Sequence, residues 1–402
     1  MPVPASFRRQ TATLPTQPAR VGWLTCLARG LLAVAGGFGL AAAWASDRID
    51  VQTTDGSVVT GRVVRAARDG SLLIEHDCGR YELLGPTDIT LRSAAAGPPV
   101  VERPADFGHR LLAELPAGFD LLVTKHYVVC FDTTREYAKW CAALFERLHD
   151  AFGNFWSRAG LEVTDPECPL VVVIFADRRT YETHAAADLG VAADRVVGYY
   201  NLLSNRITTF DLTGSDLLAA ERGRQPGRVG LEILAHPAAA GLVSTLVHEA
   251  THQLAFNDGM HRRLAPVPLW VSEGVATYFE TPDLAHARAW RAVGAVNRPR
   301  LNRFLETYRP GCVTAVVCGD EAFRDPNRAI DAYATAWAVC HHLLQVRKQD
   351  FVDYLRVLAE KQPLDDDSPD QRLAEFEAAF GDPAVIEEAV LKAMARLASR
   401  PH

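Results

Sequence analysis

The chain has 402 residues, of which 48% are hydrophobic and 23% are charged, and its formal net charge is −7. This composition excludes a disordered or collagen-like chain, and the acidic balance argues against nucleic acid as a partner. The length predicts two or three domains.

Residues 1–45 have the features of an export signal. They hold four arginines and no acidic residue, the run from Gly30 to Ala43 is uncharged and mostly apolar, and Ala43-Trp44-Ala45 offers a small-x-small cleavage site. Segments of this kind in this order are typical of a secretory signal peptide. The sequence therefore predicts a secreted or periplasmic protein. The alternative is an uncleaved N-terminal membrane anchor.

Residues 46–93 are predicted to form a small all-β module. Short alternating runs are separated by Asp-Gly pairs at positions 55–56 and 69–70, and such pairs favour tight hairpin turns. Five short strands in this segment indicate an SH3-like β-barrel, which could bind a partner in the cell envelope. Residues 94–106, with three prolines, are predicted to be a linker.

Residues 107–402 are predicted to form one α+β domain, because strands come first and helices later. Its first part, 107–236, mixes both types, and 237–402 has an almost entirely helical pattern. The elements expected in the first part are strands at Tyr127–Phe131 and Leu170–Phe175, a helix at 134–158, and a hairpin of 196–200 and 206–210.

Seven cysteines follow the predicted signal, and no two of them have C-x-x-C spacing. A zinc site built from thiolates is therefore not expected. Cysteines can pair in an oxidising compartment, and the nearest neighbours, Cys312 and Cys318, are the pair expected to form a disulfide. Most of the others lie in apolar runs and are expected to be buried and free.

The segment from His248 to His252 reads H-E-x-x-H. On a helix, His248 and His252 lie one turn apart on the same face and can direct ring nitrogens at one ion. Glu249 is rotated by roughly 100° from His248, so its carboxylate can serve a water beside the metal as general base. The motif also arises by chance, and a surface helix with two histidines is the alternative.

A second expected helix supplies a third ligand. It begins after Pro266 and Pro268, and Glu273 lies near its start. A catalytic zinc site takes three protein ligands and keeps one position open. Glu280, two turns further along, is expected to support the site or the fold, and Asp258 is the alternative third ligand.

These two segments together resemble the gluzincin zinc peptidases. The helix Trp270-x-x-Glu273-Gly-x-Ala-x-Tyr-x-Glu280 is most similar to that of alanyl aminopeptidase-type enzymes. A looser resemblance over about 107–400 is to the peptidase MA-like proteins, a bacterial group of largely uncharacterised function. No segment like the G-A-M-E-N motif, which binds a free amino terminus, precedes His248, so aminopeptidase activity is not implied.

The resemblance implies a zincin-like (thermolysin-like) catalytic domain that binds one zinc ion per chain. His248, His252 and Glu273 would hold the zinc, and Glu249 would be the general base for peptide-bond hydrolysis. Gluzincins often place a tyrosine or histidine from a later helix near the oxyanion, and Tyr333 is the candidate here. Its alternative is a core tyrosine.

The sequence thus predicts a zinc metallopeptidase that acts on peptides or proteins and uses no nucleotide cofactor. Two alternatives belong to other functional classes. One is a catalytically inactive zincin-fold protein that serves as a binding or scaffold protein of the cell envelope. The other is a metal-dependent hydrolase of a non-peptide substrate.

Overall fold

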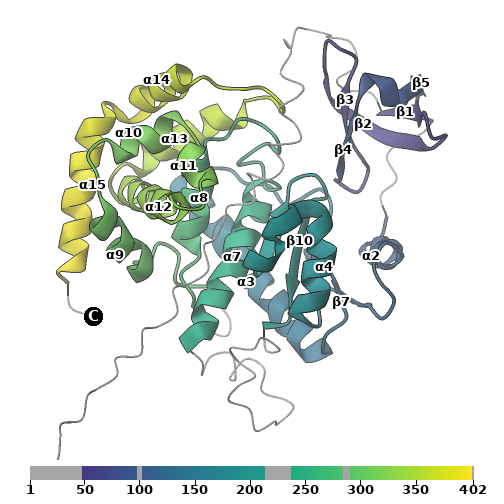
Figure 1. Cartoon of the computed structure of the whole chain (residues 1–402), viewed down its shortest axis with the longest axis horizontal. Coiled ribbons are helices and arrows are strands. Elements are labelled where there is room, and N and C mark those ends of the chain that lie inside the picture. Colours follow the sequence, from purple (N-terminus) through teal and green to yellow (C-terminus); the bar gives the residue numbers. More distant parts are fainter. Residues whose placement is uncertain (1–47, 97–101, 213–236, 284–289, 401–402) are drawn as a thin grey trace, which may run out of the picture.

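The computed structural model describes residues 48–96, 102–212, 237–283 and 290–400, which form two β-sheets and a large group of helices (Figure 1). The fold is mixed α+β with a helical C-terminal part, as the sequence predicts. The predicted signal peptide, residues 1–45, lies outside the described residues. Within the described ranges, no helix is both long enough and apolar enough to cross a membrane.

The first sheet contains all five strands predicted for the β module, and neighbouring strands pair antiparallel in the order β4-β3-β2-β1-β5. The strands are β1 (Arg48–Thr53), β2 (Val58–Ala66), β3 (Leu72–Glu75), β4 (Tyr81–Leu84) and β5 (Ile89–Ala94). β4 and β5 lie at opposite ends of this order, so the described strands form an open sheet; the predicted closure into a barrel is not observed.

The β module contacts the rest of the protein through β3 and β4. The backbone N–H of Tyr81 donates to the carbonyl of Leu203 at 2.8 Å. The guanidinium of Arg263, a 4% exposed residue, lies 3.7 Å from the centroid of the Tyr81 ring and donates to Glu75 at 3.2 Å. A buried guanidinium needs such partners, so the docked module stabilises Arg263.

The second sheet is mixed and has the order β6-β7-β8-β10-β9. Its strands are β6 (Asp120–Val123), β7 (Tyr127–Phe131), β8 (Leu170–Phe175), β9 (Gly198–Asn201) and β10 (Arg206–Phe210). β7, β8 and β10 run parallel, and β6 and β9 pair antiparallel at the two edges. The predicted strands and hairpin are confirmed, whereas β6 was not predicted.

Two long helices, α3 (Arg135–Ala159) and α7 (Pro237–Ala255), pack against the second sheet and against each other. The side chain of Thr134 caps the start of α3 by accepting from the Tyr137 N–H, and Gly160 ends the helix with φ 86°. This confirms the helix predicted over 134–158. Two shorter helices also contact the sheet: α2 (Pro104–Leu112) and α4 (Arg178–Leu189).

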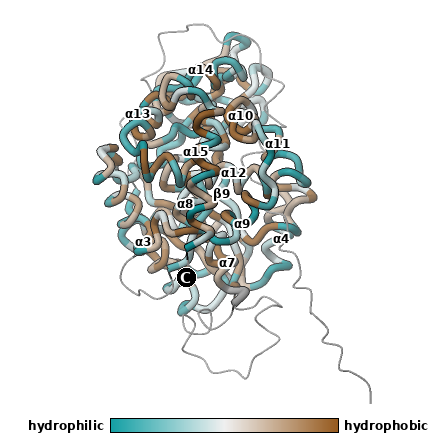
Figure 2. The backbone as a smooth tube through the Cα atoms, turned by 90° about the vertical axis from the view of Figure 1, so that its left-hand side faces the viewer, coloured by the Kyte–Doolittle hydropathy of each residue, from teal (hydrophilic) through white to brown (hydrophobic). Residues whose placement is uncertain are grey.

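The C-terminal helices surround α12, which contacts most of the others (Figure 1). These helices are α8 (Leu269–Phe279), α9 (Arg298–Thr307), α10 (Cys312–Cys318), α11 (Glu321–Arg324), α12 (Ala329–Val346), α13 (Lys348–Ala359), α14 (Pro369–Phe380) and α15 (Pro383–Ala398). Along them, hydrophobic and hydrophilic stretches alternate (Figure 2), as expected for amphipathic helices around a common core.

All seven described cysteines are free, so the predicted disulfide between Cys312 and Cys318 is wrong. These two residues begin and end α10. Six helical residues rise about 9 Å, whereas a disulfide needs Cα atoms roughly 4.4–6.8 Å apart. Three other cysteines, Cys130, Cys141 and Cys340, are buried, as expected for structural thiols.

Candidate metal centre

The H-E-x-x-H motif lies on α7, near its C-terminal end. Val243, Val247 and Leu254 of this helix are fully buried, and their spacing fixes one face against the protein core. His248 and His252, at 7% and 5% exposure, project one turn apart from the same helix. The motif is therefore part of the interior, not of a surface helix.

Glu273 lies in the second turn of α8, which begins directly after Pro268, as predicted. The N–H of Leu269 donates to the carboxylate of Asp320 at 3.1 Å, and Arg372 forms a two-contact ion pair with the same carboxylate. An anion at a helix N-terminus stabilises the helix. Asp320 thus fixes the start of the helix that carries Glu273.

The three predicted ligands converge. Nε2 of His248 lies 3.1 Å from Nε2 of His252 and 3.0 Å from Oε2 of Glu273, and the last two atoms are 3.4 Å apart. Ligand atoms at the corners of a tetrahedron with bonds of about 2.0–2.1 Å are roughly 3.3–3.4 Å apart. The donor set and its spacing therefore fit a zinc ion. Asp258 does not belong to this cluster.

Glu280 holds His248 from the opposite side of the ring. Its Oε2 lies 2.9 Å from Nδ1 of His248, and its Oε1 accepts from Asn297 at 2.8 Å and from Arg300 at 3.1 Å. A carboxylate at Nδ1 keeps the hydrogen on that nitrogen and leaves the Nε2 lone pair for a metal. Glu280 is thus placed for the supporting role expected from the sequence.

The charges of the cluster also favour a cation. Burial opposes the protonation of His248, but Glu273 and Glu280 raise its pKa to about 9. Burial likewise opposes the ionisation of Glu273, but His252 and His248 lower its pKa to about 2. Without a metal, the site therefore holds an imidazolium between two carboxylates. A divalent ion can replace that proton and neutralise the same carboxylates.

Glu249 is buried beside the cluster without belonging to it. Its Oε2 accepts the backbone N–H of Tyr200, on β9, at 3.0 Å. Burial raises the pKa of Glu249 above its ordinary value. The hydrogen bond from Tyr200 therefore fixes the orientation of the Glu249 carboxylate. Burial makes this carboxylate hold a proton more tightly than an exposed glutamate would.

Tyr333, on α12, borders the same cluster. Its ring centroid lies 6.2 Å from that of His248, and the guanidinium of Arg300 lies 5.4 Å from the Tyr333 ring centroid. The residue is 2% exposed and also packs edge-on against Phe323. The structure thus brings Tyr333 to the site, and the same ring is part of the core.

Three supporting residues were not predicted: Asn297, Arg300 and Asp320. Asn297 and Arg300 donate to Glu280 from 17 and 20 positions away in the sequence, and Asp320 accepts from the first residue of α8 from 51 positions away. No periodicity or local motif in a single sequence carries such a signal.

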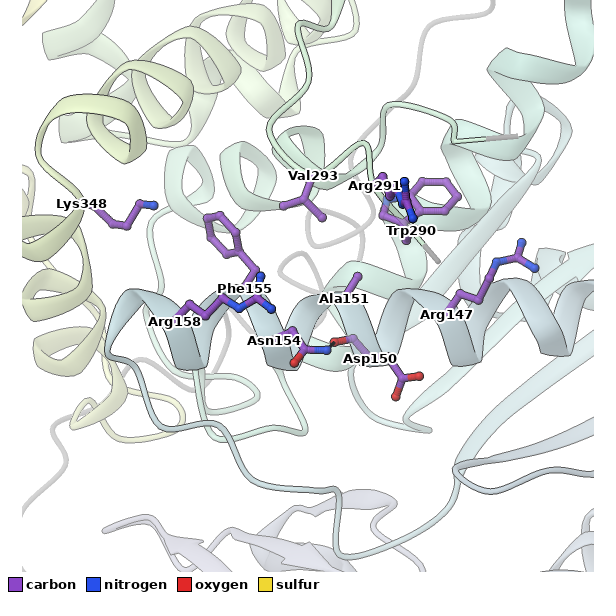
Figure 3. Close-up of a pocket in the computed structure, with 10 residues that line it drawn as sticks. All are labelled: Arg147, Asp150, Ala151, Asn154, Phe155, Arg158, Trp290, Arg291, Val293 and Lys348. Atoms are coloured by element: carbon purple, nitrogen blue, oxygen red, sulfur yellow. Dashed lines mark hydrogen bonds between the residues drawn. The ribbon is translucent and has the colours of Figure 1, made fainter. Parts of the chain in front are cut away.

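A cavity of about 570 Å³ lies along α3 (Figure 3). Its lining includes four cationic side chains, namely Arg147, Arg158, Arg291 and Lys348, and one acidic residue, Asp150. None of the lining residues belongs to the cluster of His248, His252 and Glu273.

Comparison with known protein families gives a match to the part of the chain that contains this site. Residues 242–365 match the model of DUF1570, described as a protein of unknown function. The matched segment contains the three candidate ligands, Glu249 and Tyr333. No curated protein matches the sequence.

Proposed function

We propose that this chain is a zinc-dependent peptidase of the gluzincin type, with a zincin-like (thermolysin-like) catalytic domain over residues 107–402. The observation that carries the proposal is the convergence of His248, His252 and Glu273 at 3.0–3.4 Å, with Glu249 held beside them. A zinc ion held by these three residues would supply Lewis-acid activation of water and of the scissile carbonyl.

The chain's own residues would perform the proton transfers and the positioning. Glu249 would take a proton from the attacking water and pass it to the leaving amine. Burial raises the pKa of Glu249, which moves it toward the value that suits a general base near neutral pH. The Tyr200 N–H fixes the orientation of Glu249, and Glu280 fixes that of His248.

The position of β9 supports a peptide substrate over other hydrolysable molecules. β9 is an edge strand of the second sheet and contacts α7. The Tyr200 N–H points away from β10 and toward Glu249, so the outer edge of β9 faces the proposed general base. An extended peptide can bind along such an edge by forming backbone hydrogen bonds.

The proposal also includes the remaining sequence-based expectations. Residues 1–45 would direct export to the periplasm or the medium. The β module would bind a partner in the cell envelope. Tyr333 would donate a hydrogen bond to the oxygen that gains charge during the reaction.

The decisive experiment compares the wild type with Glu249→Gln. Glutamine is nearly isosteric and can keep the hydrogen bond from Tyr200, but it is not a base. We expect unchanged zinc content and melting temperature, and a loss of peptide cleavage of about 10²–10⁴-fold or more. Glu388→Gln is the matched control, because the Glu388 side chain is 75% exposed in a surface pair with Lys392.

Two results would contradict parts of this proposal: one the role of Glu249, the other the peptidase activity itself. Wild-type cleavage by Glu249→Gln would show that another residue is the base. Zinc-bound protein that cleaves no member of a broad peptide library, in either form, would favour the scaffold function or a non-peptide substrate.

A further inference from the structure

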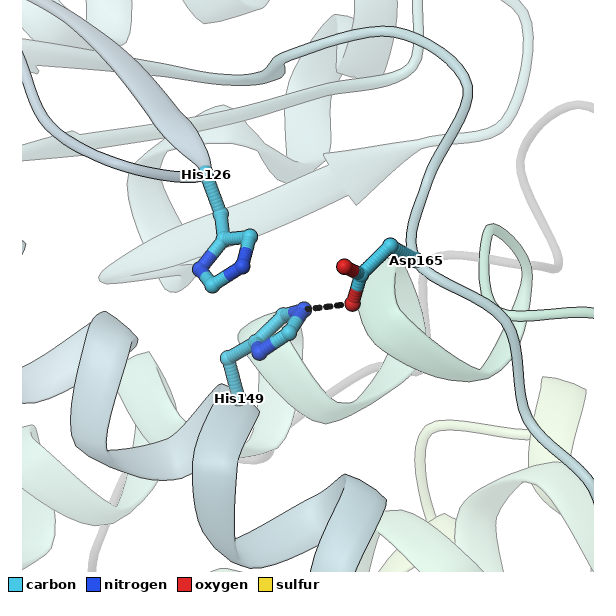
Figure 4. A group of neighbouring side chains, drawn as sticks. All are labelled: His126, His149 and Asp165. Carbon is cyan, nitrogen blue, oxygen red and sulfur yellow. Dashed lines mark ion pairs between the residues drawn. The ribbon is translucent and has the colours of Figure 1, made fainter.

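The loop between α3 and β8 carries two side chains with distinctive chemistry. One is Asp165, which lies near His126 and His149 (Figure 4). The two histidine rings stack at 16° with centroids 3.7 Å apart, so their in-plane lone pairs cannot converge on one ion and the group is not a metal site. The other side chain is Cys168, which lies against the β module.

The cysteine of the β module, Cys78, lies in the turn between β3 and β4. Gly79 N–H donates to the carbonyl of His76, and His76 N–H donates to the carbonyl of Arg80, both at 2.8 Å. Gly79 has φ 76°, which a residue with a side chain rarely adopts. The Cys78 side chain packs against the large core of the protein and not against the separate small core of the β module. This turn therefore directs a thiol at the rest of the protein.

Cys168 contacts the residues on both sides of Cys78. Its Sγ donates to the carbonyl of Asp77 at 3.3 Å. Its Cβ and its Sγ each lie 3.5 Å from the position that a Cβ on Gly79 would occupy. The two cysteines are thus neighbours in space although they are far apart in the sequence. A disulfide needs Cα atoms roughly 4.4–6.8 Å apart, and packing this close allows such a separation.

Both thiols can be reached by an oxidant, because Cys78 and Cys168 are only half-buried, unlike the buried Cys130, Cys141 and Cys340. Burial, followed by the neighbouring Cys78, raises the pKa of Cys168 to about 11. A thiol with a high pKa is a slow attacking group at neutral pH and a poor leaving group. Cys78 is therefore the first of the two to attack an oxidant, and a bond to Cys168, once formed, resists reduction.

We propose that Cys78 and Cys168 form a disulfide that fastens the β module to the rest of the protein. The oxidant is a dithiol oxidoreductase in its disulfide form. The Cys78 thiolate attacks one sulfur of that disulfide and forms a mixed disulfide, and the other sulfur leaves as a thiol. The Cys168 thiolate then attacks the Cys78 sulfur and releases the second thiol. One disulfide replaces another, and the two cysteine protons pass to the reduced oxidant.

The bond would reinforce the polar contacts that dock the β module. Those contacts include the hydrogen bond from Tyr81 to Leu203, in the turn between β9 and β10, and the ion pair of Arg263 with Glu75. Export, proposed above for residues 1–45, would bring the chain to a compartment where such oxidants act. The proposal does not depend on peptidase activity.

The test is tryptic peptide mapping of the full chain after incubation with oxidised glutathione and alkylation of the remaining thiols under denaturing conditions. Trypsin places Cys78 in the peptide 69–80 and Cys168 in the peptide 159–178, and neither peptide contains another cysteine. We expect these two peptides to be cross-linked to each other and to separate on reduction. Absence of this cross-link, with both cysteines alkylated or carrying glutathione, would overturn the proposal, as would a bond from either of them to a different cysteine.

Thermal melting tests whether the bond fastens the β module. Reduction should lower the melting temperature of the oxidised wild type by about 4 °C or more, and it should not change that of Cys78→Ser. Cys318→Ser is the matched control, because Cys318 is also half-buried and ends α10; this variant should keep the cross-link and melt like the wild type. A cross-linked wild type that melts at the same temperature in both states would overturn the fastening role.

Discussion

Replacing Glu280 by glutamine tests the geometry of the metal centre without touching a predicted ligand. Oε1 of Glu280 accepts from both Asn297 and Arg300, so the amide oxygen of the introduced glutamine must take that position. The amide NH₂ then faces Nδ1 of His248, where Oε2 lies 2.9 Å away in the wild type. An N–H donor at this position favours the His248 tautomer that carries its hydrogen on Nε2. In that tautomer Nε2 has no lone pair free to bind a metal.

The expected cost follows from that change of tautomer. Loss of a carboxylate that supports a ligating histidine weakens metal binding by about 10–100-fold, which equals about 1.4–2.8 kcal/mol. Zinc affinity is measured by competition with a coloured chelator, and the fold is checked by thermal melting without zinc. The metal-free variant should also melt at a lower temperature, because the His248 imidazolium and the buried Arg300 lose a charged partner, so zinc affinities are compared at a temperature where both proteins are folded.

Glu388→Gln controls for the loss of one negative charge far from the site. A zinc affinity of Glu280→Gln within about threefold of the wild type, which is less than 1 kcal/mol, would refute the reasoning. It would mean that Glu280 does not set the tautomer of His248 in the metal-bound protein.

Two further predictions concern the helices around the site. Gly274→Ala would place a Cβ 2.2 Å from Sγ of Cys340 and 3.0 Å from the carbonyl of Ala336, so the free energy of unfolding should fall by about 1–3 kcal/mol. The control is Gly153→Ala on α3, whose Cβ would meet nothing within 4 Å and which should be neutral or stabilising. Equal melting temperatures of the two variants would contradict this prediction. Tyr333→Phe should lower kcat by about 10²–10³-fold at unchanged zinc content if the phenol stabilises the oxyanion. An unchanged kcat would show that Tyr333 only packs in the core.

The elements that the sequence predicts well are those whose own pattern decides their structure. β8 is a continuous apolar run, fully buried between parallel neighbours, and α3 has both an amphipathic repeat and a cap at Thr134. β6 was missed because its residues Asp120–Val123 are only partly buried or exposed. Its strand conformation depends on pairing with β7, which is a tertiary contact.

The candidate metal site, too, was predictable where a local sequence pattern decides the structure and not where tertiary contacts decide it. His248, Glu249 and His252 follow from one helical spacing, and Glu273 follows from a second motif on a helix whose start is marked by prolines. Their convergence depends on how α7 and α8 pack, and Asp320 fixes the start of α8 from 51 positions away. The wrong disulfide has a related cause: Cys312 and Cys318 are close in sequence, but they lie at opposite ends of one helix, which holds their Cα atoms too far apart to pair.

The buried charges around His248 balance in two different ways, and this links the metal to the proposed base. Without a metal, an imidazolium at His248 and the guanidinium of Arg300 offset Glu273 and Glu280, and burial raises the pKa of Glu249. A divalent ion supplies one more positive charge than the proton that it replaces. This additional charge favours the ionised form of Glu249, because a nearby cation lowers the pKa of a carboxyl group. On this account, the ion that would activate the water also prepares Glu249 to accept its proton.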